Sequence, residues 1–114
     1  LLGGSGADSL LGRGGDDVLA GGTGADLLIG GGGADHFLFA RGDGADTVQG
    51  FDSGLDRIEL AAALLGGAQT GAEVLAQFAA QVGDDVVLRF GQGDRLVLTH
   101  QHLSAALADA LVIG

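Results

Sequence analysis

Single apolar residues recur along the first third of the chain at a constant interval. Each lies nine residues after the one before it, and the four are Leu10, Leu19, Leu28 and Phe37. Glycine-rich stretches separate them, and a glycine pair in every repeat would cost a helix about 2 kcal/mol per repeat relative to alanine. The pattern therefore excludes a helix. It predicts six-residue turns alternating with three-residue strands in which only the middle side chain faces inward.

An aspartate stands two positions before each of these apolar residues, and a glycine two positions before each aspartate. The aspartates are Asp8, Asp17, Asp26 and Asp35, and the glycines are Gly6, Gly15, Gly24 and Gly33. A fifth copy at residues 41–49 has Gly44, Asp46 and Val48 in the same relation, after the insertion Phe39-Ala40. The sequence therefore predicts five loops of one kind.

Stacking of these loops would bring their aspartates together. If successive strands alternate between two sheets, one coil takes 18 residues, so Asp8 faces Asp26 and Asp17 faces Asp35. Parallel strands lie about 4.8 Å apart, and carboxylates at that spacing repel by roughly 1 kcal/mol even in water. Calcium reverses the sign, because it binds carboxylate and backbone carbonyl oxygens together, and glycine lets the carbonyls turn inward. The repeat is interpreted as a calcium-binding turn built to be stacked.

Residues 3–49 resemble the repeats-in-toxin (RTX) family, whose nonapeptide is GGxGxDxUx with U a large apolar residue. The matching copies include GGSGADSLL, GRGGDDVLA, GGTGADLLI and GGGGADHFL, whereas Arg13 and Arg41 stand where the family usually has glycine. The resemblance implies an all-β fold, a parallel β-roll that is a calcium-stacked solenoid, with about three to four Ca²⁺ ions between loops two repeats apart. The implied ligands are Gly4, Gly6, Asp8, Gly15, Asp17, Gly22, Gly24, Asp26, Gly31, Gly33, Asp35, Gly44 and Asp46.

Residues 51–114 are expected to cap the roll of residues 1–50, since a solenoid must cover its open sheet edges. Residues 46–60 resemble the exit from the roll in secreted proteases and lipases of the family, where Asp52 and Asp56 are either further calcium ligands or turn-forming residues. Thr70 and Glu73 form a capping box that predicts a helix over 70–82, with Val74, Leu75, Phe78 and Val82 on one face. Residues 84–99 read as two strands around Gln92-Gly93, and residues 104–114 as a last helical turn and a closing strand.

Charge and composition limit the classes of partner that the chain is expected to bind. The 114 residues carry 15 acidic and 5 basic side chains, a net charge of −10, which favours cations and argues against nucleic acid and anionic membranes. Cysteine is absent, so disulfides and thiolate metal sites are excluded, and the longest apolar run, residues 60–65, is too short to span a bilayer. No HExxH, GxSxG, P-loop or catalytic Cys/His pattern is present, so no enzyme is predicted.

Several other polar residues have two interpretations. His100 and His102 form an HxH pair that could bind a transition metal or lie free on the surface, and His36 is expected to face solvent. Asp84, Asp85 and Asp94 are either turn residues or calcium ligands. The outward residues Leu11, Val18, Leu27, Ile29 and Leu38 are apolar, which suggests that the cap, another domain or another chain covers part of a sheet.

The RTX resemblance also implies a biological setting. It implies the C-terminal part of a larger bacterial protein, with an N-terminal effector domain, that the type I secretion machinery exports to the extracellular medium. Calcium outside the cell would then fold the exported chain, and the tail DALVIG (109–114) is similar to the end of many such proteins. The alternative is an accessory carbohydrate-binding or adhesion module of an extracellular enzyme or surface protein, which would need a basic or aromatic groove.

Overall fold

The computed structural model describes residues 3–40, 42–52, 54–61, 64, 67–68, 70–91 and 93–113. The first six strands are β1 (Ser9–Leu11), β2 (Val18–Ala20), β3 (Leu27–Ile29), β4 (His36–Phe39), β5 (Ala45–Gln49) and β6 (Arg57–Leu60). After them come α1 (Gly71–Phe78), β7 (Ala79–Val82), β8 (Asp85–Gly91), β9 (Asp94–Leu98), α2 (Ala105–Ala110) and β10 (Leu111–Ile113). The chain is thus mostly β-structure with two short helices.

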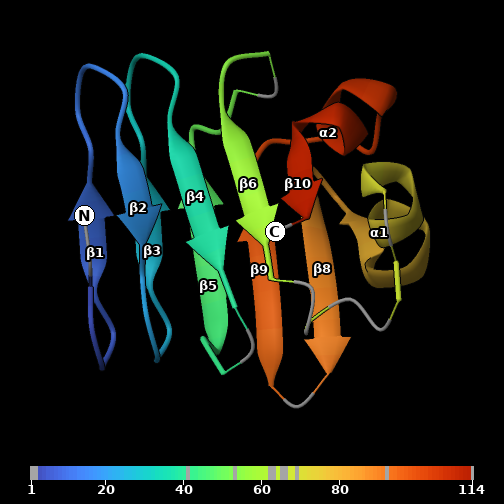
Figure 1. The fold of residues 1–114 in the computed structure, drawn as a ribbon, viewed down its shortest axis with the longest axis horizontal. Coiled ribbons are helices and arrows are strands. Elements are labelled where there is room, and N and C mark those ends of the chain that lie inside the picture. Colours follow the sequence, from blue (N-terminus) through green and yellow to red (C-terminus); the bar gives the residue numbers. More distant parts are fainter. Residues whose placement is uncertain are drawn as a thin grey trace.

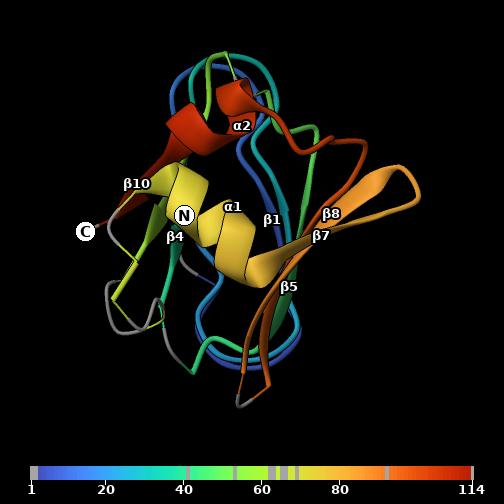
Figure 2. The same ribbon diagram turned by 90° about the vertical axis from the view of Figure 1, so that its right-hand side faces the viewer.

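The first six strands alternate between two facing sheets (Figures 1 and 2). One sheet has the order β1-β3-β5-β9-β8-β7 and the other β10-β6-β4-β2, with parallel pairing from β1 to β9 and from β2 to β10. Leu10 pairs with Leu28, and Leu19 with Phe37, which confirms the 18-residue coil. The arrangement is compatible with the predicted β-roll, and its parallel pairing continues past residue 50 into β6.

The insertion Phe39-Ala40 does not break the register. Leu28 pairs with Val48, a separation of 20 residues instead of 18 (48 minus 28), so Asp46 still falls opposite Asp26. The extra residues lengthen β4 to four residues, and Phe39 turns its side chain into the core with 6% exposure. The fifth loop therefore lies in line with the first and third.

The middle residue of each strand fills the space between the sheets, as the apolar period predicts. Leu19, Leu28, Phe37, Val48 and Ile58 are all fully buried. The ring of Phe37 lies 6.0 Å from that of Phe51, centroid to centroid, which joins the repeats to the segment after them. One or two apolar side chains per strand are thus enough to make a continuous core, because the two facing sheets share it.

The cap extends both sheets and closes the end of the space between them. β8 and β9 form an antiparallel hairpin that continues the larger sheet, and β10 continues the smaller one. Helices α1 and α2 lie across this end (Figure 2) and bury Val74, Leu107 and Ala110. Thr70 caps α1, its Oγ1 accepting the Glu73 N–H at 3.1 Å, as the capping box predicts.

The predicted helix over 70–82 is too long. Helix α1 ends at Phe78, and the next four residues form β7, which pairs antiparallel with β8. Val82 therefore lies on a strand, half exposed, instead of on the helix face. The apolar period of a helix continued through these residues, but the free backbone groups along β8 offered hydrogen bonds that a fourth helical turn could not supply.

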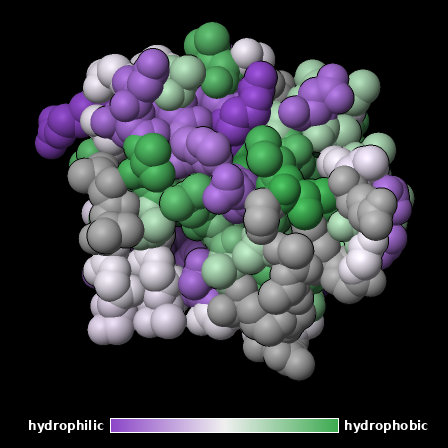
Figure 3. Space-filling view, viewed as in Figure 1, coloured by the Kyte–Doolittle hydropathy of each residue, from purple (hydrophilic) through white to green (hydrophobic). Residues whose placement is uncertain are grey.

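The cap does not cover the outer faces of the repeats. Leu11 and Val18 remain 50% and 52% exposed, and the helices pack against β7, β8 and β10. The outer face of the smaller sheet is a mixture of hydrophobic and hydrophilic side chains (Figure 3). The suggestion that the cap covers these apolar residues is therefore wrong for Leu11 and Val18. Among the described residues, no helix is long and apolar enough to cross a membrane.

Replacement of Phe37 by alanine should lower the free energy of unfolding by about 3–5 kcal/mol, because the ring is fully buried between the sheets and packs on Phe51. Urea unfolding in calcium-containing buffer measures the loss. Leu103→Ala is the control, because Leu103 is 42% exposed and its loss should stay near 0.5 kcal/mol. Equal losses for the two variants would contradict the core described above.

Candidate metal centre

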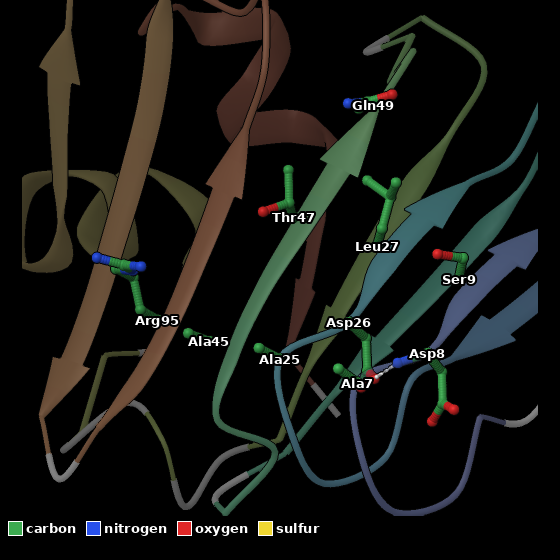
Figure 4. A pocket seen from close by; sticks show the side chains of 10 residues that line it. All are labelled: Ala7, Asp8, Ser9, Ala25, Asp26, Leu27, Ala45, Thr47, Gln49 and Arg95. Carbon is green, nitrogen blue, oxygen red and sulfur yellow. Dashed lines mark hydrogen bonds between the residues drawn. The ribbon is translucent and has the colours of Figure 1, made fainter.

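Aspartates on one side of the coil form a ladder that links successive loops. The backbone N–H of Asp8 donates to Oδ1 of Asp26 at 2.8 Å, which Figure 4 shows as a dashed line. The N–H of Asp26 in turn donates to Oδ1 of Asp46 at 3.0 Å. Each carboxylate therefore holds the backbone of the loop one coil earlier, as the predicted facing of Asp8, Asp26 and Asp46 requires.

A second ladder runs along the opposite side. The N–H of Asp17 donates to Oδ1 of Asp35 at 2.9 Å, and the N–H of Asp35 donates to Oδ1 of Asp56 at 2.8 Å. Asp56 thus occupies a ladder position although it lies outside the nine-residue frame. Asp52 differs: it is exposed, and its Oδ1 accepts the N–H of Gly54 at 2.9 Å, which is a turn-forming contact.

The second carboxylate oxygen of the four repeat aspartates has no hydrogen-bond partner. Oδ2 is buried and unsatisfied in each of Asp8, Asp17, Asp26 and Asp35. Asp26 and Asp35 are only 4% and 2% exposed. A buried anionic oxygen without a partner costs free energy, so these atoms mark places where a positive charge would be stabilising.

The glycines bring backbone carbonyls of neighbouring coils against one another. Gly22 has φ +79° and Gly24 has φ +102°, and a Cβ added at either would lie 2.2 Å from the carbonyl oxygen of Gly4 or Gly6. No side chain fits there. Loops two repeats apart therefore approach through bare backbone.

Arg13 takes the conformation of the glycine that it replaces. Its φ is +71°, and a Cβ on Gly31 would lie 2.1 Å from the Arg13 carbonyl oxygen. The loop of Arg13 therefore has the same geometry as the others, at the cost of left-handed backbone on a residue with a side chain. Arg41, the other departure from the repeat, lies outside the described residues.

This donor set fits a hard divalent cation. Such an ion takes six to eight oxygens and accepts carboxylates and carbonyls together. Across the described ranges, no three His, Cys, Asp or Glu side chains gather into a metal-binding group. That finding agrees with the ladders, because each loop offers one carboxylate and the remaining oxygens must come from the backbone.

Burial changes the acidity of the ladder carboxylates. Burial raises the pKa of Asp46 to about 7, and the negative charges of Asp26 and Asp43 add to the rise. The hydrogen bond from the Asp26 N–H acts in the opposite direction and lowers this pKa. Loss of solvent also raises the pKa of Asp35, and in the fifth loop that of Asp43. Without a cation, Asp35 and Asp46 therefore bind a proton more readily than an ordinary aspartate.

Other predicted site residues fall outside the ladders. His36 faces outward with its side chain 38% exposed, and its Nε2 lies 3.7 Å from Oε1 of Glu59. Asp85 accepts the N–H of His100 at 3.1 Å, whereas Asp84 and His102 are exposed. None of these residues joins a group of ligands in the described structure.

Asp94 has a larger role than its sequence context indicates. It is 6% exposed, and its carboxylate accepts the N–H groups of Gly42 and Gly44, at 3.1 Å each. Its local sequence, beside Gly93, is that of any turn aspartate. The partners lie about fifty residues away in sequence, so only the pairing of β5 with β9 reveals the contact.

An open hollow of about 460 Å³ lies on the outer face of the larger sheet, beside the ladder of Asp8 and Asp26 (Figure 4). Its wall is made mainly of small or uncharged residues from β1, β3 and β5, with Arg95 from β9 at one side. Asp8 and Asp26 of the first ladder also line the hollow, so it borders the ladder.

The repeats match a known family. Residues 2–37 match the model of the RTX calcium-binding nonapeptide repeat, in four copies. This part of the chain therefore consists of RTX repeats, which bind calcium, as the resemblance implied.

One of several solved structures similar to this chain comes from an epimerase. It is the solution structure of the AlgE6R3 subunit from the Azotobacter vinelandii mannuronan C5-epimerase, with 27% identity, a TM-score of 0.43, and coverage of 96% of this chain and 79% of that one. Among curated proteins, no relative matches the chain.

The metal-free chain should become less stable as pH rises. The folded-state pKa of Asp46, about 7, exceeds the ordinary aspartate value of 3.8, so the folded chain binds more protons than the unfolded chain between these values. Stability in calcium-stripped buffer should therefore be greatest near pH 4 and fall as pH rises towards 7. Thermal melts followed by circular dichroism test this, with Asp46→Asn as the control that should flatten the dependence. A melting temperature that rises with pH in stripped buffer would contradict it.

Arg13→Gly should raise the free energy of unfolding by up to about 1 kcal/mol, because it relieves the left-handed backbone of Arg13 at the smaller entropic cost of glycine. Gly22→Ala should lower it by more than about 1 kcal/mol, because the new Cβ meets the Gly4 carbonyl. Denaturant unfolding in calcium compares the two. Destabilisation by both substitutions would show that the two loops do not share one geometry.

Proposed function

We propose that the chain is a calcium-binding module in which cations lie between stacked loops and stabilise the folded repeats. The observation that carries the proposal is the set of buried carboxylate oxygens without partners, which recurs at the same position in four successive RTX repeats. Three principal sites follow from five loops: between the first and third, the second and fourth, and the third and fifth.

The proposed ligands are one carboxylate per loop together with backbone carbonyls at the glycine positions. The carboxylates are those of Asp8, Asp17, Asp26, Asp35 and Asp46. The glycines are Gly4, Gly6, Gly15, Gly22, Gly24, Gly31, Gly33 and Gly44. A fourth site with Asp52 or Asp56 has less support, because both oxygens of Asp56 already accept backbone N–H groups.

Calcium supplies positive charge between carboxylates that would otherwise repel one another. The chain provides the rest: left-handed glycines expose the carbonyls, and each Oδ1 holds the loop one coil earlier by accepting a backbone N–H. Three ions would add +6 to a formal charge of −10. Because the unfolded chain lacks these sites, binding energy becomes folding energy.

We further propose that the module belongs to a larger extracellular bacterial protein and supports its export by a type I secretion system. The acidic, glycine-rich repeats would stay unfolded in calcium-poor cytosol and fold outside the cell. An export assay of a fusion carrying residues 1–114 tests this part separately. A fusion that binds calcium but is not exported would remove the secretion role and leave the calcium function intact.

Calcium should add β-structure to a chain whose repeats are largely disordered without it, which circular dichroism with and without excess chelator would show. An unchanged spectrum and melting temperature in chelator would sink the calcium-dependent folding.

Asp26→Asn should weaken two calcium sites by at least about tenfold each, because Asp26 faces both Asp8 and Asp46. Asp8→Asn should weaken one complete site. Asparagine keeps an oxygen that can accept the ladder N–H, so the change removes charge more than structure. Calorimetric titration counts the sites, with exposed Asp109→Asn as control. Equal loss of one ion in both ladder variants would favour independent loops over stacked ones.

A further inference from the structure

Next to the cap, the last loop of each ladder side is held by a carboxylate that uses both of its oxygens. Oδ1 of Asp56 accepts the N–H of Asp35 at 2.8 Å, and its Oδ2 accepts the N–H of Asp52 at 2.9 Å. Asp94 accepts the N–H of Gly42 at 3.1 Å on both oxygens and that of Gly44 at 3.1 Å on Oδ1. Asp56 and Asp94 are 1% and 6% exposed, so the accepting carboxylates are buried, and the hydrogen bonds to them are charge-assisted.

The repeat aspartates differ in this respect. Asp8, Asp17, Asp26 and Asp35 are also linked to neighbouring backbone, but each keeps a buried Oδ2 without any partner. Those four carboxylates need a further positive group to be satisfied. Asp56 and Asp94 do not, because protein N–H groups already occupy both of their oxygens.

Strand register explains why the first ladder stops where it does. Asp46 pairs with Leu96 of β9, a core residue that is 1% exposed, so no further carboxylate stands in the ladder position. Asp94 lies two residues earlier, where the N–H of Arg95 bonds to the carbonyl of Gly44 at 2.9 Å. From there its carboxylate reaches into the fifth loop, where a sixth loop would otherwise stack.

We propose that Asp56 and Asp94 are positioning residues that fix the last loop of each ladder without a cation, and that neither binds calcium. The loops next to the cap are then ordered before calcium binds. The calcium-dependent loops can stack on these ordered loops. The inference rests on the proposed calcium function for the repeats, but its first test is made in the absence of calcium.

Amide hydrogen exchange of residues 1–114 in excess chelator gives that test. The amides of Gly42, Gly44 and Asp52, which donate to the two terminal carboxylates, should exchange at least about tenfold more slowly than those of Asp8 and Asp17. Asp8 and Asp17 are matched controls, because their N–H groups also donate to aspartates, but to ones with an unsatisfied oxygen. Equal exchange at both ends, including exchange at unfolded rates throughout, would overturn the proposal.

Calcium titration of Asp94→Asn gives the second test, with Asp26→Asn as the same chemical change at a proposed ligand. Asp94→Asn should leave the number of bound ions unchanged while it speeds exchange at Gly42 and Gly44 at least about tenfold in chelator. Loss of an ion from Asp94→Asn would make Asp94 a ligand and overturn the proposal. If Asp94→Asn fails to fold, the exchange pattern of the unsubstituted chain decides. A chain that binds no calcium yet keeps the exchange pattern would refute the proposed function alone.

Discussion

The hydrogen bond from one aspartate N–H to the Oδ1 of the aspartate one coil later is the contact on which the repeats depend. It holds loops 18 to 21 residues apart in sequence at the spacing of neighbouring strands. This hydrogen bond uses only one of the two oxygens of each carboxylate. The second oxygen is carried into the protein by the same geometry, so the contact that stacks the loops also creates their need for a cation.

The aspartate hydrogen bond can form only because glycine occupies the positions where neighbouring loops meet. Loops can come close enough for the aspartate ladder only if nothing projects between them, and a Cβ at Gly22 or Gly24 would collide with a carbonyl of the preceding coil. The resulting backbone is costly to order, and each short strand contributes only one or two apolar side chains to the core. This small core is consistent with the proposal that cations between the loops stabilise the repeats.

The cap solves a different problem. Two parallel sheets end in free backbone groups, and the cap satisfies them with β9, the β8 hairpin and β10, while its helices close the space between the sheets. The larger sheet changes from parallel to antiparallel pairing at this point, so its outermost strand, β7, is no longer a template for another repeat. The ladders end there too: Asp56 is the last carboxylate of one, and Asp94 holds the fifth loop at the end of the other.

The sequence alone determined the coil, because glycine, aspartate and an apolar residue recur at intervals that only one stacking satisfies, and Asp8 and Asp26 could be paired by counting. Outside the nine-residue repeats, the sequence pattern did not predict every feature of the structure correctly. The helix ending at Phe78 instead of Val82 was decided by the pairing of β7 with β8, and the burial of Asp94 by a contact between β9 and a loop about fifty residues earlier. Local sequence records the energy of a residue with its near neighbours, whereas these outcomes depend on which distant backbone groups lacked a partner.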